Sequence, residues 1–525
     1  MNKTIELELL PEEAYSEALL SQVIYDKLSL APTGDKIVVP LRRSVDARGR
    51  SVVVRLLVDV VPKSEFVSGV SIKSTYREVS KSERVVIIGA GPAGLFAALR
   101  LIELGVKPIV VERGKDVRER RRDIAAINKE HIVNPESNYC FGEGGAGTYS
   151  DGKLYTRSKK RGDVKKILNV LVEHGAREEI LFDAHPHIGT NKLPGIVTAL
   201  RESVLAAGGE IHFNTKVVDI LMDNGQVRGV VTNDGQKMEG KSVILATGHS
   251  ARDIYELLDK KGVRLEAKPF ALGVRVEHQQ SLIDKIQYHC EVRDAFLPAS
   301  SYALVNQSMV NGNQYGVFSF CMCPGGFIVP AATAPGEIVV NGMSPSRRDS
   351  RYANSGIVVA VQESDYKDYQ RFGKLAGMHF QADIEKRAFE LGGRTQTAPS
   401  QLLADFVEGR AGDKKLDTSY QPGLNPIDMT ELLPSFITKS LKLAFRSFGK
   451  KMSGYLTNEA QIVGVESRTS SPVRIPRDKN SFEHLQVKRL FPCGEGAGYA
   501  GGIVSAAMDG ERCAEAAVKL YLTKK

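Results

Sequence analysis

The feature that most constrains this chain is a glycine-rich turn that joins an apolar run to a helix near residue 90. Residues 84–88 read Arg-Val-Val-Ile-Ile, and Gly89, Gly91 and Gly94 follow in a Gly-x-Gly-x-x-Gly pattern. The first glycine permits a tight turn, the second removes a Cβ that would keep a pyrophosphate away, and the third allows close helix–strand packing. A helix that begins at Pro92 would direct free N–H groups at the phosphates. The pattern predicts a dinucleotide-binding βαβ unit.

The next segments supply the rest of this unit. We expect a helix over residues 92–104 and a second strand over residues 108–111, which ends at Glu112. Glu112 lies 23 residues after Gly89, where an acidic residue binds the ribose hydroxyls in such units. A plain βαβ crossover without a ligand is the alternative. The same glycine spacing recurs within residues 142–147, but no apolar strand precedes it, so we expect no second unit there.

Composition limits the possible classes of protein. A chain of 525 residues predicts two or three domains. The net charge of +9, from 71 basic and 62 acidic side chains, is a modest excess that does not imply nucleic-acid binding. Six cysteines without framework spacing suit a reducing compartment. We find no basic-then-apolar leader pattern and no apolar run of the eighteen or so residues that a membrane helix needs. We therefore expect a cytoplasmic protein that does not contact membranes.

The pattern of elements divides the chain into three parts. A small α+β module, like half of a ferredoxin-like fold, comes first and ends in a polar linker over residues 63–82. A Rossmann-type domain follows, and a mixed α/β substrate domain interrupts it. The predicted boundaries are 1–75 for the module, 82–250 with 485–525 for the discontinuous dinucleotide-binding domain, and 251–484 for the inserted substrate or cap domain.

Local patterns predict several further features. Tight-turn signals at 223–225 and 233–235 separate strands at 217–222, 227–232 and 242–246, which suggests a three-stranded meander. Interleaved charges at 118–123 predict a solvent-facing helix. The arginines between residues 42 and 50 predict a hairpin tip, for which solvation is favoured over a binding surface.

Three later segments favour a flavin over a nicotinamide as the bound dinucleotide. An apolar strand ends in Ala246-Thr247-Gly248, where small residues let a cofactor approach the backbone. The loop over residues 141–151 contains four glycines with unhindered N–H donors. Near the C-terminus, Gly494-Glu495-Gly496 follows a strand and Gly501-Gly502-Ile503 begins a helix.

This combination of motifs resembles the two-dinucleotide-binding-domain flavoproteins, the glutathione-reductase-type FAD superfamily. Within it, the segments 141–154, 321–326 and 493–503 are similar to those of a group of bacterial and plastid proteins described only as FAD-dependent dehydrogenases. The resemblance covers most of the chain. It implies an α/β fold with a Rossmann-type FAD-binding domain, non-covalently bound FAD, and no particular substrate.

The resemblance also implies roles for individual residues. The glycines near residue 90 would hold the pyrophosphate, Glu112 the adenosine ribose, and the Val218 backbone the adenine. Gly502 and Ile503 would place a helix N-terminus at the flavin O2 edge. Related proteins commonly have Asp where Glu495 stands, so its hydrogen bond would reach farther or pass through water. The full expected FAD-binding set is Gly89, Gly91, Pro92, Ala93, Gly94, Glu112, Arg113, Gly144, Gly145, Ala146, Gly147, Val218, Ala246, Thr247, Gly248, Gly494, Glu495, Gly501, Gly502 and Ile503.

The flavin itself carries out the hydride chemistry, so no catalytic residue is assigned. The sequence contains one Rossmann unit, so electrons would come from transiently bound NAD(P)H, from a protein donor or from the substrate. Tyr149, Asp151 and Lys153 are the polar groups expected closest to a small-molecule substrate. By position only, Arg394 and Gln396 could close a pocket lid.

Cysteines and histidines carry less weight. For Cys321 and Cys323, small buried apolar side chains are favoured over a redox dithiol, because Cys-x-Cys does not match the Cys-x-x-Cys geometry. No tetrahedral zinc spacing is present, so we expect no metal. Structural roles are favoured for His185 and His187.

The leading hypothesis is an FAD-dependent oxidoreductase that acts on a small molecule. Two alternatives stay open. One is a flavin-dependent enzyme that modifies tRNA or another RNA, suggested by the arginines near residue 45. The other is an FAD-binding electron carrier or redox sensor whose N-terminal module binds a partner protein.

Overall fold

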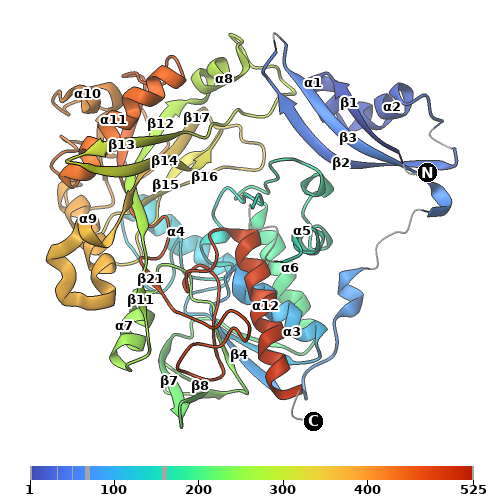
Figure 1. Ribbon diagram of the computed structural model, residues 1–525, viewed down its shortest axis with the longest axis vertical. Helices are drawn as coiled ribbons and strands as arrows, with labels where there is room; N and C mark the ends of the chain where they lie inside the picture. The colour runs from blue at the N-terminus through green and yellow to red at the C-terminus, as the bar shows by residue number, and fades with distance from the viewer. Residues whose placement is uncertain (1–2, 32–33, 50, 66–70, 157–161, 523–525) are drawn as a thin grey trace.

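The computed structural model describes residues 3–31, 34–49, 51–65, 71–156 and 162–522. These residues form an N-terminal module, a parallel-sheet domain that contains both the first Rossmann strand and the C-terminal helix, and a domain built on a seven-stranded sheet (Figure 1). This agrees with the α/β fold expected from the sequence. Among the described residues, the helices are all too short or too polar to cross a lipid bilayer.

The N-terminal module is a three-stranded antiparallel sheet with two helices on one face. The strand order is β1-β3-β2. Apolar residues that alternate along β1 and β3 pack against Ala14 and Ile24 of the helices, as period-two patterning requires. The elements are β1 (Lys3–Leu9), α1 (Pro11–Tyr15), α2 (Glu17–Lys27), β2 (Lys36–Asp46) and β3 (Val53–Pro62).

The arginines expected at a solvated hairpin tip lie partly within this sheet instead. Strand β2 continues to Asp46, with a register shift between Pro40 and Arg42. Arg42 is exposed, but Arg43 is only 7% exposed and its Nε lies 2.8 Å from an Asp183 carboxylate oxygen. The expectation of a fully solvated tip was therefore wrong for Arg43, because the bulge turns its side chain onto the neighbouring domain.

The second domain is a five-stranded parallel sheet in the order β22-β10-β4-β5-β6. Its strands except the edge strand β6 are mainly apolar runs, as expected of a sheet covered on both faces. Helices α3 and α12 pack together beside it (Figure 1), and Gly510 in α12 permits this because a Cβ there would clash with Ala93 O. The elements are β4 (Arg84–Ile88), α3 (Pro92–Glu103), β5 (Lys107–Val111), α4 (Val117–Glu130), α5 (Val164–Glu173), α6 (Leu193–Ala206), β6 (Glu210–His212), β10 (Val243–Leu245), β22 (Leu490–Pro492) and α12 (Ile503–Leu522).

The meander differs from the expected one in its third strand. It consists of β7 (Val217–Asp223), β8 (Gln226–Thr232) and β9 (Lys237–Glu239). The segment expected as the third strand, residues 242–246, forms β10 and pairs in parallel with β4 and β22. Its three residues, Val243–Leu245, are all fully buried, which suits the centre of a parallel sheet rather than a half-solvated meander.

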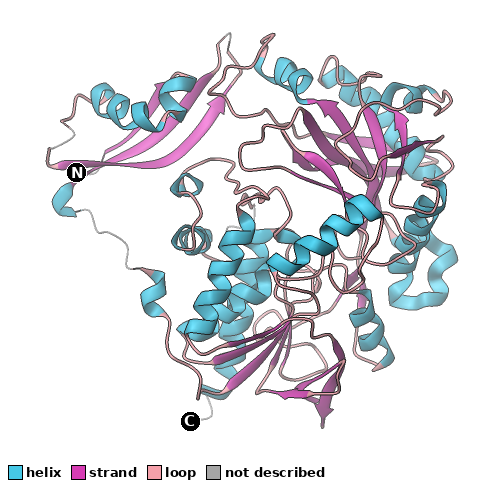
Figure 2. Ribbon diagram, turned by 180° about the vertical axis from the view of Figure 1, so that it is seen from behind, coloured by secondary structure: helices cyan, strands magenta, loops and turns pink. Residues whose placement is uncertain are grey.

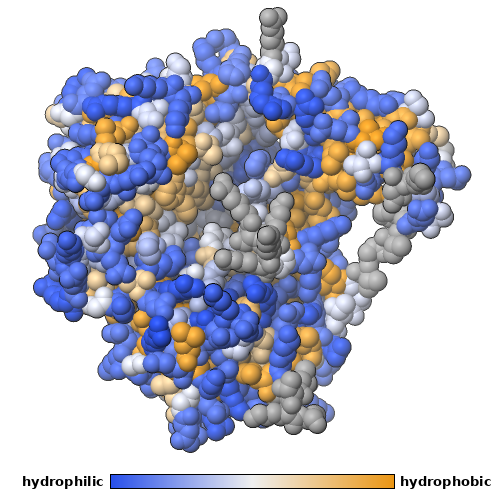
Figure 3. All heavy atoms as spheres, viewed as in Figure 1, coloured by the Kyte–Doolittle hydropathy of each residue, from blue (hydrophilic) through white to orange (hydrophobic). Residues whose placement is uncertain are grey.

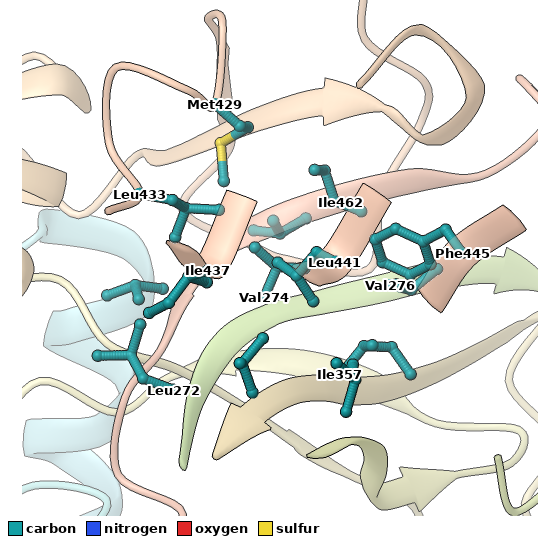
Figure 4. Packing of buried hydrophobic residues seen from close by; sticks show 14 of the residues in the cluster. Leu272, Val274, Val276, Ile357, Met429, Leu433, Ile437, Leu441, Phe445 and Ile462 are labelled. Atoms are coloured by element: carbon teal, nitrogen blue, oxygen red, sulfur yellow. The ribbon is translucent and has the colours of Figure 1, made fainter. Parts of the chain in front are cut away.

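The third domain is built on the sheet β13-β14-β17-β12-β20-β18-β19. Helix α11 lies across it, and Ile437, Leu441 and Phe445 pack onto Val274, Val276 and Ile357 of the central strands (Figure 4). Figure 2 shows this sheet and the parallel sheet as separate layers. The elements are α7 (Arg252–Lys260), β11 (Glu266–Ala267), β12 (Phe270–Gln279), α8 (Gln280–Tyr288), β13 (Val305–Val310), β14 (Asn313–Cys323), β15 (Phe327–Pro330), β16 (Val340–Met343), β17 (Tyr352–Val361), α9 (Ala376–Leu391), β18 (Ala398–Leu402), α10 (Leu403–Glu408), β19 (Leu424–Pro426), α11 (Ser435–Lys451), β20 (Gln461–Glu466) and β21 (Val473–Arg474).

Arg43 attaches the N-terminal module to the parallel-sheet domain. Besides its ion pair with Asp183, its Nη1 donates to Ala14 O at 2.9 Å, and its backbone N–H donates to Phe182 O at 2.7 Å. Its guanidinium lies 4.5 Å from the Tyr15 ring centroid and 5.1 Å from that of Phe182.

Figure 3 shows hydrophilic residues over most of this face of the molecule, with apolar residues gathered on the module.

We predict that Arg43→Ala loosens the attachment of the N-terminal module. The substitution leaves Asp183 without its partner and removes the packing on two rings, at a cost of about 2 kcal/mol. Limited proteolysis should release the module faster than in the wild type, and urea denaturation should begin earlier. The exposed neighbour supplies a matched control, because Arg42→Ala should change neither. Equal proteolysis of the two variants would contradict this role of Arg43.

Candidate functional site

Four parallel strands end at one edge of the sheet, and a cavity of about 400 Å³ lies there. Strand β4 leads into Gly89, β5 into Glu112, β10 into Ala246 and β22 into Cys493. Parallel α/β sheets bind ligands outside the carboxyl ends of their strands. The cavity continues beyond this edge to residues of the seven-stranded domain, among them Phe320, Cys321 and Arg468.

The three glycines of the first turn have different physical roles. Gly89 has a φ of 101°, and a Cβ there would lie 2.5 Å from Ala246 O. Gly94 packs against the same turn, because its Cβ would clash with Gly89 O. Gly91 has extended backbone angles, and the nearest atom to its Cβ would be Gly145 Cα at 3.9 Å. Only at Gly91, therefore, would a side chain project into the cavity without disturbing the fold.

The glycine loop that faces this turn is held by Arg120. This residue lies in α4, where interleaved charges predicted a solvent-facing helix, yet its side chain is fully buried. Its guanidinium donates to Asn138 O at 2.7 Å, Glu143 O at 2.8 Å and Gly145 O at 2.9 Å. The expectation of solvent exposure was wrong here, because three backbone carbonyls of the loop replace water around the guanidinium. Burial lowers the pKa of Arg120.

Glu112 connects the same loop to two other segments. One carboxylate oxygen accepts from Ala90 N at 2.8 Å, and the other accepts from Gly114 N and Gly142 N at 2.9 Å each. Glu112 lines the cavity and is 5% exposed. The residue expected to bind a ribose therefore also fixes the backbone around it.

Arg113 follows Glu112 and is tightly held. Its guanidinium lies 2.6 Å from Glu136 and 2.9 Å from Asp253, and it covers the Phe141 ring at 4.3 Å from the centroid. Lys216 pairs with the same two acids, at 2.9 and 3.4 Å. This network closes one end of the cavity with charged groups.

The C-terminal segment supplies a buried acid and a helix N-terminus. Helix α12 begins at Ile503, so its first N–H groups face the cavity edge. Burial raises the pKa of Glu495 to about 7, although the Lys268 ammonium acts in the opposite direction. Opposite them, the Thr247 hydroxyl is buried without a hydrogen-bond partner among the described residues. A buried polar atom of this kind needs a ligand or a water.

A cluster of charges lies at the other end of the cavity. Asp151 is 1% exposed and pairs with Arg348 at 2.7 Å and with Lys153 at 3.0 Å. Burial opposes ionisation of Asp151, but these two cations hold its pKa well below its usual range. Tyr149 donates from its hydroxyl to Val117 O at 3.0 Å. Tyr149, Asp151 and Lys153, expected near a substrate, all line the cavity.

Most of the expected FAD-binding residues line one cavity. The residues that do so are Gly89, Gly91, Pro92, Ala93, Glu112, Arg113, Gly145, Ala146, Gly147, Ala246, Thr247, Gly248, Gly494, Glu495, Gly501, Gly502 and Ile503.

Three expected residues do not line the cavity. Gly94 supports the first turn, and Gly144 donates from its N–H to Ala90 O at 2.8 Å. Val218 lies at a register shift between β7 and β8 with its side chain 45% exposed, and its neighbour Val217 lines the cavity instead. Contact between the Val218 backbone and adenine therefore stays a prediction.

The suggested lid is not formed by Arg394 and Gln396. Arg394 is exposed, while Gln396 is 1% exposed and donates to Glu337 O at 3.0 Å. Neither residue lines the cavity. His187 has the structural character that was favoured: its Nε2 lies 3.1 Å from Ser346 O, and burial lowers its pKa to about 4.

Sequence reasoning missed the residues that the third domain contributes. Phe320, Arg468 and Thr469 line the cavity, but no local motif marks them, because only the tertiary fold brings their strands to this edge. The Arg468 guanidinium lies 2.6 Å from Glu337 and 2.9 Å from Glu385. A buried arginine beside two acids can indicate a functional site, but Arg468, Glu337 and Glu385 lie too far apart in the sequence for a local pattern to link them.

The site fits the group that the resemblance implied. Gly91 leaves a space that a Cβ would fill, the Thr247 hydroxyl has an unused hydrogen bond, and α12 directs N–H groups at the cavity. Donors without side chains above them suit phosphate oxygens. FAD is therefore compatible with the residues present.

We predict that Gly91→Leu abolishes FAD binding and leaves the fold intact. Its backbone angles are accessible to leucine, but the new side chain would occupy the space of the phosphates. The purified variant should carry at least about tenfold less flavin than the wild type, with an unchanged circular dichroism spectrum. Gly195→Leu is the matched control, since a Cβ at Gly195 in α6 meets nothing within 4 Å. A fully yellow Gly91→Leu protein would contradict the assignment of this cavity.

Comparisons with known proteins agree with this site. Residues 83–285 match the pyridine nucleotide-disulphide oxidoreductase family, residues 269–469 match "FAD-dependent protein, C-terminal domain-like", and residues 1–61 match a domain of unknown function (DUF8436). Thiamine thiazole synthase of Aeropyrum pernix is 28% identical over 32% of this chain and 55% of its own length. The crystal structure of CtdE in complex with FAD is 12% identical, covers 84% of this chain and 85% of its own, and has a TM-score of 0.33, too low to establish a shared fold.

One relative matches from end to end. An "Uncharacterized protein" of Clostridium beijerinckii is 40% identical over 522 residues, which are 96% of this chain and 96% of that protein. Together with the FAD-dependent C-terminal domain match and the oxidoreductase match, this makes FAD the cofactor of the protein. The chain belongs to the family of the Clostridium beijerinckii protein, within the superfamily of FAD-dependent oxidoreductases.

Proposed function

We propose that the protein transfers a hydride between a small-molecule substrate and non-covalently bound FAD, in a site of the glutathione-reductase type. The observation that supports this most is the continuity of the cavity. It runs from the glycine turn at the sheet edge to the charged cluster at Asp151 and Lys153. One end suits a dinucleotide, and the other leaves room for a second molecule beside the flavin ring.

The residues of the chain would bind and orient both molecules. Gly91 and the N-terminus of α3 would hold the pyrophosphate, and Glu112 the ribose. FAD supplies the hydride chemistry when it is bound. The N-terminus of α12 would stabilise negative charge on the O2 side of the ring. Phe320 and Val329 would exclude water from the reacting atoms, while Asp151, Lys153 and Arg348 would orient a polar substrate.

The fold bears on the possible sources of electrons. Among the described residues, one sheet consists entirely of parallel strands, and the carboxyl ends of its strands lie at the proposed FAD cavity. A second dinucleotide domain of the reductase type would need another. The electrons would therefore come from NAD(P)H that enters the substrate end of the cavity transiently, from a protein donor, or from the substrate itself. Action in the cytoplasm stays a prediction.

The RNA-modifying alternative loses its main support. It depended on an exposed group of arginines, but Arg43 is buried against Asp183, and Arg48 pairs with Asp46 at 2.7 Å. The electron-carrier alternative differs in kinetics, because a carrier or sensor would reduce slowly and would not turn over small acceptors.

Anaerobic stopped-flow absorbance with NADH, NADPH and candidate substrates tests the proposed function. A small-molecule oxidoreductase should show rapid bleaching of the flavin band and catalytic turnover on addition of an acceptor. Lys153→Met should slow the step that depends on substrate concentration while FAD content stays constant. Flavin that a protein donor reduces, but that exchanges electrons with no small molecule in either direction, would contradict the proposal.

We also predict that FAD binding weakens above pH 7 because of Glu495. Its raised pKa means that the folded apoprotein holds this proton up to about pH 7. Nearby phosphate charge would raise this pKa further, so binding takes up a proton, and the dissociation constant should rise by up to about tenfold per pH unit above 7. His249, also at the cavity, has its pKa lowered by burial to about 4 and does not titrate in this range.

Fluorescence titration of FAD between pH 6 and pH 9 measures this dependence. Glu495→Gln should flatten it, because the amide cannot ionise. Glu511→Gln is the control: burial raises the pKa of Glu511 too, but this residue lies outside the cavity. An unchanged pH dependence in Glu495→Gln would remove Glu495 from the FAD site.

A further inference from the structure

Two cysteine sulfurs contact a single ammonium group at the substrate end of the cavity. Lys153 Nζ lies 3.7 Å from Cys321 Sγ and 3.7 Å from Cys323 Sγ. Cys321 and Lys153 line the cavity, whereas Cys323 is fully buried behind them. The accessible sulfur therefore has a second, shielded sulfur beside it.

A bulge in β14 creates this arrangement. The register against β17 shifts between Phe320 and Cys323, and Cys321 has a φ of 47°. In a regular strand, residues two apart lie on the same face about 7 Å from each other. The bulge bends the strand locally, so that both sulfurs contact the same Nζ. Left-handed residues other than glycine are uncommon and cluster at functional sites.

The surroundings favour a negative charge on Cys321. A hydrogen bond from Cys323 and the nearby cations Lys153 and Arg275 lower the pKa of Cys321 well below its ordinary value, although burial opposes them. A side-chain hydrogen bond with Cys321 and burial raise the pKa of Cys323, whose thiol also donates to Cys321 O at 3.2 Å. Arg275 lies on the buried side, with Nη1 3.9 Å from Cys323 Sγ and Nε 2.8 Å from Glu466. These opposite directions favour a thiolate at Cys321 and a thiol at Cys323.

We propose that Cys321 and Cys323 form a redox pair that exchanges two electrons with the bound FAD. In the direction of oxidation, the Cys321 thiolate and the Cys323 thiol together lose two electrons to FAD, the Cys323 S–H bond breaks, and an S–S bond forms between the two sulfurs. The two electrons pass to FAD, which also takes up two protons, one from Cys323 and one from solvent. The reverse step restores the thiolate and the thiol. This inference goes beyond the proposed function and rests only on FAD occupying the cavity.

The other cysteines lack these features. Cys140 also lines the cavity, but its sulfur lies beside the Ser250 hydroxyl at 3.6 Å, and burial raises its pKa. Cys493 lines the cavity and its sulfur lies within 4.8 Å of that of Cys513, which the Arg477 guanidinium contacts at 3.2 Å, but both cysteines are fully buried and the pKa of Cys493 is raised by its hydrogen bond with Cys513. A ring closed by two residues so near in sequence would be strained, and strained disulfides are the readily reduced, reactive ones.

Anaerobic dithionite titration of the oxidised holoenzyme tests the pair. The wild type should take up four electrons per FAD, two for the flavin and two for the disulfide. Cys321→Ser and Cys323→Ser should each take up two. Cys140→Ser, at the same cavity, and Cys290→Ser, outside it, should still take up four. An uptake of two electrons by the wild type, or a drop in Cys140→Ser alone, would overturn the inference.

Mass spectrometry of the wild type gives a result that does not depend on any variant. The oxidised protein should weigh less than the reduced protein by two hydrogen atoms, and the peptide that contains both cysteines should resist alkylation. If the flavin accepts electrons from small molecules while this mass difference is absent, the redox pair fails and the proposed function stands. If the mass difference appears but no small molecule reduces the flavin, only the proposed function fails.

The role of Lys153 has its own readout. Alkylation of Cys321 by iodoacetamide at pH 7 should be at least about tenfold slower in Lys153→Met, because less thiolate is present. Lys153→Arg should restore the rate, since it keeps the positive charge. Equal rates in the wild type and both variants would show that Cys321 is not a thiolate stabilised by Lys153.

Discussion

The carboxylate of Glu112 is the interaction on which the site depends. It accepts hydrogen bonds from the turn after β4, from the segment after β5 and from the glycine loop, and so joins three backbone segments that have few side chains of their own to pack. Arg120 then binds the carbonyl groups of the same loop. An acid that accepts N–H groups and a base that donates to C=O groups satisfy both kinds of backbone polarity. The loop can therefore keep a fixed shape even though many of the residues that line the cavity are glycines.

The third domain supplies the part of the cavity lining that lies beyond the edge of the parallel sheet. The hydrophobic contact between α11 and the central strands of the seven-stranded sheet keeps that sheet rigid (Figure 4). Its β14 carries Cys321 near its C-terminal end, at the cavity, while Arg275 lies buried in the middle of β12. Cys321 thus reaches the cavity although it lies far from the parallel sheet in the sequence. Chemistry at this end depends on how the two sheets are placed and not on any one motif.

The sequence was sufficient for the parts that obey local rules. Gly89 and Gly94 mark the turn because a Cβ at either would clash with the backbone, Gly91 leaves space at the cavity, and Glu112 follows from the length of one βαβ unit. The meander was assigned one strand wrongly, because turn signals at 233–235 do not show which sheet the next apolar run joins. Arg43 and Arg120 were expected in solvent, since a charge pattern shows neither an acid from a distant segment nor a set of carbonyl partners.

Cys321 and Cys323 illustrate a different limit. Their spacing in the sequence argued against a dithiol, because the usual motif places its cysteines at the start of a helix. The bulge in β14 produces a comparable proximity by bending a strand, and Lys153 arrives from the glycine loop more than a hundred residues earlier in the chain. Neither the bulge nor the lysine is visible from the cysteine spacing.

The contact at Arg43 has a mechanical consequence for the cavity. Arg43 contacts Phe182 and Asp183, and this segment continues to His187. His187 forms an isolated antiparallel β-bridge with Lys153. Leu154 N also donates to Pro186 O at 2.9 Å. The N-terminal sheet therefore supports, through residues 182–187, the segment that contains Lys153. None of the described residues of the N-terminal module lines the cavity, so this support for Lys153 comes from outside the cavity.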